Sequence, residues 1–280
     1  MEKVNKMLKN KVVVVTGAGG VICSEMASFV ASLGAKVALL DLNKEAAEKY
    51  AEKIREKGFE ARAYKCNVLD MESIKKAHVL VLKELGQCDI WINGAGGNNP
   101  LATCDNEYHE LKLSKETKTF FDLDKTGIEF VFNLNILGTI LPTQVFAKDM
   151  IGRKECSILN ISSMNAYTPL TKIVAYSGAK AAVSNFTQWL AVHFSHVEIR
   201  CNAIAPGFLR TNQNEKLLFD ENGIPTARTE KILSSTPMGR FVESKELNGA
   251  LEFLIDYEKS SAVTGVVIPV DCGFSAYSGV

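Results

Sequence analysis

This sequence has no excess of charge of either sign. Its 280 residues include 32 basic and 32 acidic side chains, so the formal net charge is +0 and the isoelectric point is about 6.9. Nucleic acids and anionic membrane surfaces attract proteins that carry a basic excess. The charge balance therefore argues against both as partners.

Long apolar runs and paired cysteines are also missing. The longest apolar runs, such as residues 12–15, have the length of a strand and fall far short of a membrane span. The first residues, MEKVNKMLKN, lack the apolar core of a signal peptide. The seven cysteines are scattered without a Cys-x-x-Cys pair, which argues against a disulfide framework and a zinc site. We therefore expect a cytoplasmic protein without a metal.

The chain instead alternates short apolar segments with amphipathic ones, and no internal repeat interrupts it. Its hydrophobic content of 46% and charged content of 23% are ordinary for a soluble globular protein. This alternation predicts one α/β domain over residues 1–280, with a Rossmann-like, doubly wound, seven-stranded parallel sheet. The predicted strands are residues 11–16, 36–40, 60–68, 89–92, 156–161, 199–205 and 265–270. The predicted helices are residues 24–33, 44–57, 71–85, 128–150, 176–194 and 243–256.

Residues 160–180 carry the side chains best suited to chemistry. Tyr176 and Lys180 are four residues apart and share one helix face, where an ammonium group would lower the pKa of the phenol. Ser163 lies at the C-terminal end of the preceding strand, where open parallel sheets place their ligands. These three groups favour proton transfer to or from a carbonyl oxygen. Because Tyr-x-x-x-Lys also occurs by chance on long helices, the other motifs decide between the two readings.

Two further patterns indicate a dinucleotide site. The turn after the first strand, TGAGGVIC, is rich in glycine, which lets backbone amides approach a pyrophosphate at a helix N-terminus. The second strand ends in Asp41, which can accept both ribose hydroxyls and would repel a 2′-phosphate. No arginine follows Asp41, so the pattern favours NAD (NADH) over NADP. The alternative is that the glycines only close a turn and that Asp41 or Asn43 caps the next helix.

In this order, the motifs resemble the short-chain dehydrogenase/reductase family over nearly the whole chain. They are the glycine turn, Asp41, the NGAG turn at residues 93–96, Ser163 with the Tyr-x-x-x-Lys pair, and the PG turn at residues 206–207. The resemblance implies that Tyr176 transfers a proton, Ser163 binds the carbonyl oxygen, Lys180 supports the tyrosine and the ribose, and Asn135 holds a relay water. The implied cofactor contacts are Gly17, Gly19, Gly20, Val21, Ile22, Asp41, Asn67, Val68, Asn93, Ala95, Tyr176, Lys180, Pro206, Gly207 and Thr211.

The chain departs from the family pattern in both turns that face the expected cofactor. Val21 and Cys23 stand at the later glycine positions of TGxxxGxG, and Cys23 is small enough for close helix packing. Gly94 replaces the second asparagine of the family's NNAG turn. Asn67 replaces the usual aspartate, and its amide still offers a donor and an acceptor to adenine.

Two long polar segments flank the expected site. Residues 98–127 lengthen the family pattern by about fifteen residues. They either wall the substrate pocket or form a solvated excursion that packs through Phe120 and Phe121. Residues 208–240 predict a lid. The expected substrate contacts are Asn98, Ser163, Asn165, Arg210 and Asn212, with Arg210 as the carboxylate clamp.

Several stretches, among them NGAGGNNP, NISSMNAYTPLTK and VDCGFSAYSGV, resemble the branch of the family that interconverts D-fructuronate and D-mannonate. The alternatives are another polyol or sugar-acid dehydrogenase, such as a gluconate 5-dehydrogenase, or a catalytically silent NAD-binding scaffold. Scaffold relatives usually lose the tyrosine or the lysine, and both are present here. The resemblance also implies a homo-oligomer, a tetramer or a dimer, in which Phe186 and Trp189 serve either the interface or the core.

Overall fold

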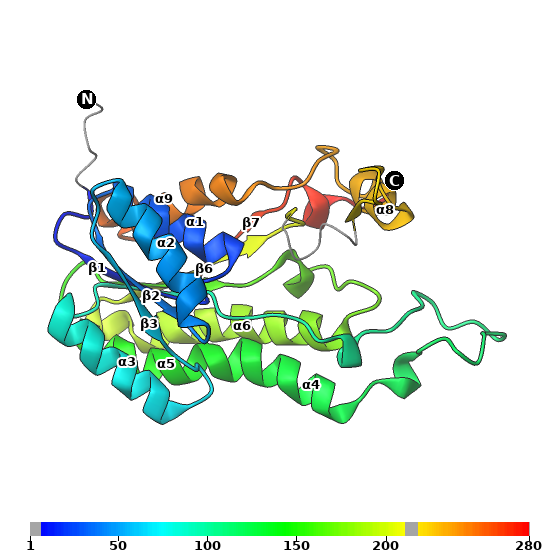
Figure 1. The fold of residues 1–280 in the computed structure, drawn as a ribbon, viewed down its shortest axis with the longest axis horizontal. Helices are drawn as coiled ribbons and strands as arrows, with labels where there is room; N and C mark the ends of the chain where they lie inside the picture. Colours follow the sequence, from blue (N-terminus) through cyan, green and yellow to red (C-terminus); the bar gives the residue numbers. More distant parts are fainter. Residues whose placement is uncertain (1–6, 211–217, 280) are drawn as a thin grey trace.

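The computed structural model describes residues 7–210 and 218–279 and contains one seven-stranded sheet in which every neighbouring pair is parallel (Figure 1). The strand order is β3-β2-β1-β4-β5-β6-β7. The order reverses between β1 and β4, and ligands of such sheets bind at the C-terminal strand ends beside that point. The strands are β1 (Val12–Thr16), β2 (Lys36–Asp41), β3 (Ala61–Lys65), β4 (Ile90–Asn93), β5 (Ser157–Ile161), β6 (Arg200–Pro206) and β7 (Val267–Val270). The predicted fold class is confirmed.

Helices cover both faces of the sheet (Figure 1). One face carries α1 (Val21–Ser32), α2 (Lys44–Glu56) and α9 (Leu247–Ile255). The other carries α3 (Met71–Glu84), α4 (Lys125–Phe132), α5 (Gly138–Phe146) and α6 (Val174–His193). Two shorter helices follow β6 in the chain. They are α8 (Ala227–Ser234) and α10 (Tyr257–Ser260), which comes directly after α9.

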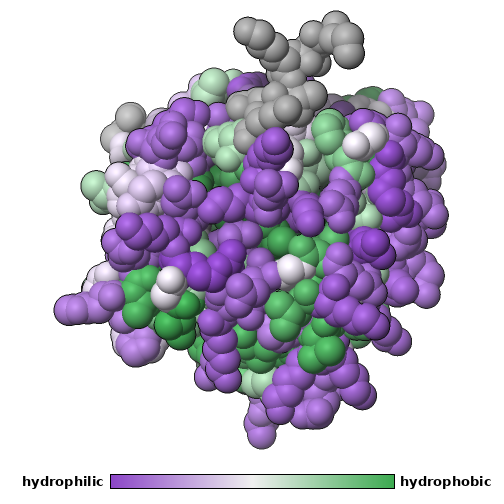
Figure 2. Space-filling model, turned by 90° about the vertical axis from the view of Figure 1, so that its left-hand side faces the viewer, coloured by the Kyte–Doolittle hydropathy of each residue, from purple (hydrophilic) through white to green (hydrophobic). Residues whose placement is uncertain are grey.

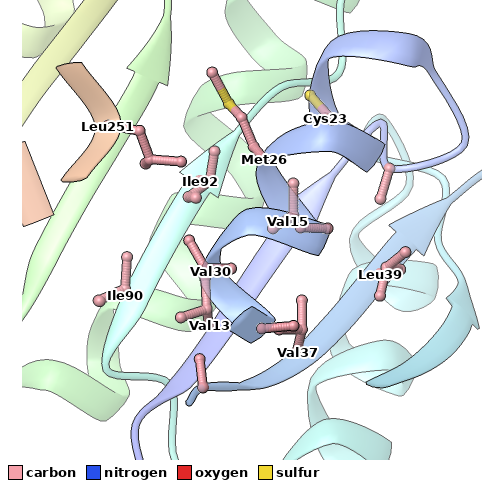
Figure 3. Close-up of a cluster of buried hydrophobic side chains, with 14 of the residues drawn as sticks. Val13, Val15, Cys23, Met26, Val30, Val37, Leu39, Ile90, Ile92 and Leu251 are labelled. Carbon is pink, nitrogen blue, oxygen red and sulfur yellow. The ribbon is translucent and has the colours of Figure 1, made fainter. Parts of the chain in front are cut away.

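The valines of β1 explain why that strand reads as an unbroken apolar run. Val13 and Val15 face α1 and pack with Met26 and Val30 (Figure 3), whereas Val12 and Val14 belong to the core on the other side of the sheet. Burying a side chain of this size contributes about 1.5–3 kcal/mol. The strand is therefore stabilised from both faces, as expected for a central parallel strand.

Local turn chemistry explains where several elements begin and end. The Asn43 side chain accepts a hydrogen bond from Ala46 N and caps α2, as the sequence predicted. Strand β3 ends at Lys65, earlier than predicted, because the Asn67 side chain closes a turn by accepting a bond from Leu69 N at 3.0 Å. Helix α1 begins at Val21, earlier than predicted, because the glycine turn is complete by Gly20.

The predicted long helix spans residues Lys125–Met150, and its middle is a π-helical turn at Asn133–Leu137. By length and composition this helix could cross a membrane, but it lies against the sheet with Phe146 and Met150 fully buried. It is therefore the core helix of a layered domain. Asn135 lies at the centre of this π turn, a local distortion that is frequent at functional sites.

The segment 98–127 and α8 lie at the same end of the molecule as the chain's C-terminal segment (Figure 1). The face at the opposite end is largely hydrophilic, with small apolar patches (Figure 2). Phe120 and Phe121 are 63% and 79% exposed and contact each other, and Phe121 also contacts His109, so these rings do not anchor the segment in the core as the solvated-excursion alternative expected. The reason is local, because a capping box at Thr119 and Asp122 turns the chain outward there.

Candidate active site

Ser163 and Tyr176 come together at the C-terminal end of β5. Ser163 follows the strand and caps a short 3₁₀ turn, Met164–Ala166, by accepting a hydrogen bond from Asn165 N at 3.2 Å. Tyr176 lies in the first turn of α6, and its phenol is near enough to the Ser163 side chain for Ser163 to lower its pKa. The sequence predicted this convergence. The pair can therefore act on one substrate oxygen.

Lys180 lies one turn after Tyr176 and is 4% exposed. Its Nζ donates to Ile161 O at 2.8 Å and lies 5.7 Å from the centroid of the Tyr176 ring. Burial lowers the pKa of Lys180 from 10.5 to about 8. Burial raises the pKa of Tyr176 to about 12, and the nearby Ser163 side chain opposes part of that rise.

The expectation that Lys180 lowers the pKa of Tyr176 is therefore wrong for this structure. Its ammonium group is turned to a backbone carbonyl, and burial dominates the titration of the phenol. The physical cause is the loss of water around both side chains, which disfavours the charged form of each. At neutral pH the phenol carries its proton, so it stands ready as a proton donor.

Asn135 is fully buried and holds the turn that follows β4. Its Nδ2 donates to Gly97 O at 2.7 Å and to Val131 O at 2.8 Å, and its Oδ1 accepts from Gly97 N at 3.2 Å. A Cβ on Gly96 would lie 2.7 Å from Asn135 Oδ1 and 3.2 Å from Lys180 Nζ. Glycine at position 96 therefore lets the turn pass directly beside both groups.

The glycine turn after β1 meets the NGAG turn after β4. Gly17 has a φ of +66°, and a Cβ there would lie 2.9 Å from the Ala95 backbone. The Thr16 hydroxyl accepts hydrogen bonds from Gly94 N at 3.0 Å and Ala95 N at 3.2 Å. Two backbone turns that approach this closely form a narrow cradle, which fits the pyrophosphate and ribose of a dinucleotide.

Asp41 joins this cradle to the end of β2. Its Oδ2 accepts from Gly19 N at 2.8 Å and its Oδ1 accepts from Asn43 N at 2.8 Å. An ionised carboxylate offers about four lone-pair sites, so this partly exposed group retains capacity for ribose hydroxyls. The Asp41 carboxylate also places negative charge where the 2′-phosphate of NADP would bind, so it would repel that cofactor. The site fits NAD.

The other predicted cofactor residues that the structure describes lie at three places in the fold. Gly20, Val21 and Ile22 form the N-terminus of α1, and Pro206 and Gly207 end β6, where a Cβ on Gly207 would lie 2.5 Å from Asp271 Cα. Asn67 and Val68 follow β3, and Val68 packs on Gly138 of the long helix. All of these lie at C-terminal strand ends. Thr211 lies outside the described residues.

The Asn93 side chain points into the core. Its Nδ2 donates to Thr143 Oγ1 and to Asn160 Oδ1, each at 2.8 Å, and the residue is 3% exposed. This side chain joins β4, β5 and α5 in a buried polar network, so cofactor contacts at this position fall to the backbone. The reason is the alternation of a strand, which turns the side chain of Asn93 into the core.

Among the predicted substrate residues, Asn165 contacts Ser163 directly, through its backbone N. Asn165 is buried and its Oδ1 has no hydrogen-bond partner among the described residues. Asn98 is exposed, and its Nδ2 donates to Thr103 Oγ1 at 3.0 Å. The Arg210 guanidinium lies 4.3 Å above the Phe219 ring. Asn212 lies outside the described residues.

Sequence reasoning missed the contacts that connect the segment 98–127 to its surroundings. Cys104 N donates to Lys172 O at 2.9 Å, and Glu107 forms an ion pair with Lys231 of α8. Glu107 and Lys231 are 124 residues apart, so no local pattern could have revealed the pair. Within residues 7–210 and 218–279, no group of three His, Cys, Asp or Glu side chains is placed to hold a metal.

Comparison with known proteins agrees with this geometry. Residues 11–222 match the short chain dehydrogenase family. An uncharacterized oxidoreductase of Haemophilus influenzae is 65% identical over 276 residues, covering 99% of this chain and 97% of that protein. The uncharacterized oxidoreductase UxuB of Bacillus subtilis is 44% identical over 280 residues and the full length of both chains.

Solved structures extend the comparison to the cofactor. A Haemophilus protein provisionally named a D-mannonate oxidoreductase, solved with bound NAD, has a TM-score of 0.95 and 66% identity over 98% of both chains. An NAD⁺-bound xylitol dehydrogenase has a TM-score of 0.81 and 28% identity, covering 94% of this chain and 98% of its own. The chain therefore belongs to the short-chain dehydrogenase family and is an NAD-dependent oxidoreductase acting on CH–OH groups.

Proposed function

We propose that this enzyme interconverts D-fructuronate and D-mannonate with NADH and NAD. The observation that carries the proposal is the likeness to the NAD-bound Haemophilus protein provisionally named for this activity, at 66% identity and a TM-score of 0.95. The polar surroundings of Ser163 support it, because a sugar acid offers a row of hydroxyl groups and one carboxylate. Asn165 is buried beside Ser163 with an unpartnered oxygen that suits a substrate hydroxyl.

The proton chemistry follows from the protonation states of the buried groups. When bound, NAD supplies the hydride chemistry. In the reducing direction Tyr176 donates its proton to the oxygen that becomes the alcohol, which suits a phenol whose pKa burial raises to about 12. Ser163 donates a hydrogen bond to the same oxygen, which stabilises the negative charge that develops there. The phenolate that remains on Tyr176 must then recover a proton.

Lys180 and Asn135 are proposed to return that proton. The pKa of Lys180 is lowered to about 8, close to working pH, so its ammonium group can release and regain a proton. Asn135 fixes the turn at Gly96 and Gly97 beside the lysine and, in our proposal, holds the relay water there. Lys180 would also hold the nicotinamide ribose, through rotation of its Nζ away from Ile161 O.

A panel assay of NADH absorbance tests this function. D-fructuronate should be the best ketone, ahead of 5-keto-D-gluconate and of a neutral ketose, and NADH should outperform NADPH. A preference for 5-keto-D-gluconate would favour a gluconate 5-dehydrogenase, and a preference for neutral polyols would refute the sugar-acid proposal. Binding of NADH without turnover of any ketone would favour a catalytically silent scaffold.

Arg210 is proposed as the clamp for the substrate carboxylate. Arg210 lies near the end of β6, with its guanidinium 4.3 Å from the centroid of the Phe219 ring, and a guanidinium can bind a carboxylate with two hydrogen bonds. A charged hydrogen bond contributes about 1.5–3 kcal/mol, so Arg210→Met should raise KM for fructuronate roughly tenfold or more. KM for a neutral ketose should hardly change. Arg228→Met, another exposed arginine of the lid, is the matched control. Equal losses on both substrates would place the clamp elsewhere.

We also propose that the enzyme is a homo-oligomer, a tetramer or a dimer. A groove of about 720 Å³ runs between α5 and α6 and is lined largely by apolar side chains, including Ile140, Ile151, Phe186, Trp189 and Phe194. Trp189 stacks between Phe186 and His193 and is still 55% exposed. An apolar face of this kind favours burial against a second copy. Light scattering should show an oligomer that Trp189→Lys weakens, and a monomeric wild-type protein would refute the proposal.

A further inference from the structure

Two residues that depart from the family pattern, Cys23 and Gly94, lie directly against each other. A Cβ built on Gly94 would lie 2.0 Å from Cys23 Sγ, an overlap that no real side chain tolerates. It would lie 2.8 Å from Thr16 O and an ordinary 3.5 Å from Cys23 Cβ. The sulfur of Cys23 therefore occupies the space in which a side chain at position 94 would begin. Figure 3 shows Cys23 on α1, on the same side of the sheet as Val15.

The turn that contains Gly94 is packed on both sides. The Thr16 hydroxyl accepts from Gly94 N and Ala95 N, and Gly17 leaves no room between the two backbones. Two residues farther on, a Cβ on Gly96 would lie 2.7 Å from Asn135 Oδ1 and 3.2 Å from Lys180 Nζ. Because Gly94 and Gly96 belong to one short turn, a displacement at Gly94 would shift the turn relative to these two groups.

Cys23 acts in this arrangement by its size. It is 4% exposed, and burial raises its pKa to about 12, so the thiol stays neutral and unreactive at physiological pH. The charge on Lys180 opposes part of that rise, which agrees with the two side chains lying near each other. A neutral, compact, polarizable atom is suited to fill a gap between two backbone turns.

We propose that Cys23 is a positioning residue, which wedges the turn at residues 93–96 so that Lys180 and Asn135 keep the geometry that proton return requires. Cys23 and Gly94 form a size-matched pair, in which either residue tolerates change only when the other changes with it. The inference rests on the proposed roles of Lys180 and Asn135. It predicts that the glycine at position 94 is required by the sulfur of Cys23 and by Thr16 O together.

A double-mutant cycle of Cys23→Ala and Gly94→Ala tests the size matching. Gly94→Ala alone should lower kcat at least a hundredfold, because the new methyl group meets the sulfur. In the Cys23→Ala background the nearest atom of residue 23 would be Cβ at 3.5 Å. In that background Gly94→Ala should therefore lower kcat tenfold or less. The remaining loss of kcat would come from the contact of the new methyl group with Thr16 O at 2.8 Å. Equal losses in both backgrounds would overturn the proposal.

Three measurements separate positioning from simple destabilisation. Cys23→Ala should lower kcat several-fold and move the midpoint of its pH profile, with NADH affinity retained, and the nearly isosteric Cys23→Ser should restore both. Cys201→Ala, which alters another fully buried thiol in β6, should lower the melting temperature without moving the pH midpoint. Unchanged kcat and pH profile in Cys23→Ala would refute the positioning role. The coupling in melting temperature across the cycle needs no substrate, so it remains informative if fructuronate proves not to be the substrate.

Discussion

At the scale of single residues, burial decides the charge states in the site. Tyr176 and Lys180 sit side by side, yet the pKa of the phenol rises to about 12 and that of the lysine falls to about 8. Both shifts favour the neutral form, as loss of water demands. Motif spacing alone suggested a charged lysine that acidifies its neighbour. The described structure instead pairs a neutral donor with a lysine able to exchange a proton near neutral pH.

Replacement of Tyr176 by phenylalanine tests the proton donor. Tyr176→Phe keeps the ring and its packing and removes the hydroxyl, so kcat should fall at least about a hundredfold. NADH should still bind, which a fluorescence titration measures. Tyr167→Phe is the control, because it removes a phenol that donates to Val267 O at the start of β7 and should leave kcat largely unchanged. Near-normal turnover in Tyr176→Phe would contradict the mechanism.

At the scale of elements, the segment 98–127 is attached to the rest of the site at two points. Cys104 N bonds to the loop between Ser163 and Tyr176 through Lys172 O, and Glu107 pairs with Lys231 of α8. These contacts join the segment to the loop between Ser163 and Tyr176 and to α8, which lies within the predicted lid. They support the alternative in which it walls the substrate pocket.

The ion pair between Glu107 and Lys231 should tune access to that pocket. Glu107→Gln weakens the attachment of α8, so we expect KM for the substrate to rise about two- to fivefold, since exposed ion pairs contribute little, with kcat unchanged or slightly higher. The charge-reversed double variant, Glu107→Lys with Lys231→Glu, should restore KM. The control is Glu252→Gln, which breaks an exposed pair with Lys259 far from the lid. An unchanged KM at low ionic strength would show that the two elements move independently.

At the scale of the whole molecule, the burial of Lys180 lowers the free energy of unfolding. Its folded pKa of about 8 lies below the unfolded value of 10.5, so between these values the unfolded chain binds more protons. The free energy of unfolding should therefore rise with pH across that window. A shift of this size corresponds to roughly 3 kcal/mol of destabilisation at neutral pH.

Lys180→Met should remove this penalty. Losing the hydrogen bond to Ile161 O costs about 1 kcal/mol, so the variant should gain stability on the order of 2 kcal/mol at pH 7 while losing activity. The stability advantage of the variant should shrink as the pH rises toward 10.5 and vanish well above it, where the native lysine is neutral in both states. Urea unfolding at pH 7 and pH 10 measures it, with the exposed variant Lys76→Met on α3 as the control. A less stable Lys180→Met at pH 7 would contradict this reading of its pKa.

Most of the fold could be predicted from the sequence, because its signals are local. The valine run of β1, the helix cap at Asn43 and the positions of Ser163, Tyr176 and Lys180 each depend on a few neighbouring residues. Boundaries failed where a side chain closed an unforeseen turn, as Asn67 does after β3. Even there the type and order of the elements were right, since hydrophobic periodicity specifies them.

Only the tertiary structure decided which distant segments contact each other and which side chains are shielded from water. By itself the sequence determined the sheet, its helical layers and the position of Ser163 at the end of β5. It did not reveal that Asn93 joins a buried network, that Cys23 fills the space beside Gly94, or that Glu107 reaches Lys231. These contacts join residues far apart in the chain, and the pKa shifts depend on burial that only the assembled layers produce.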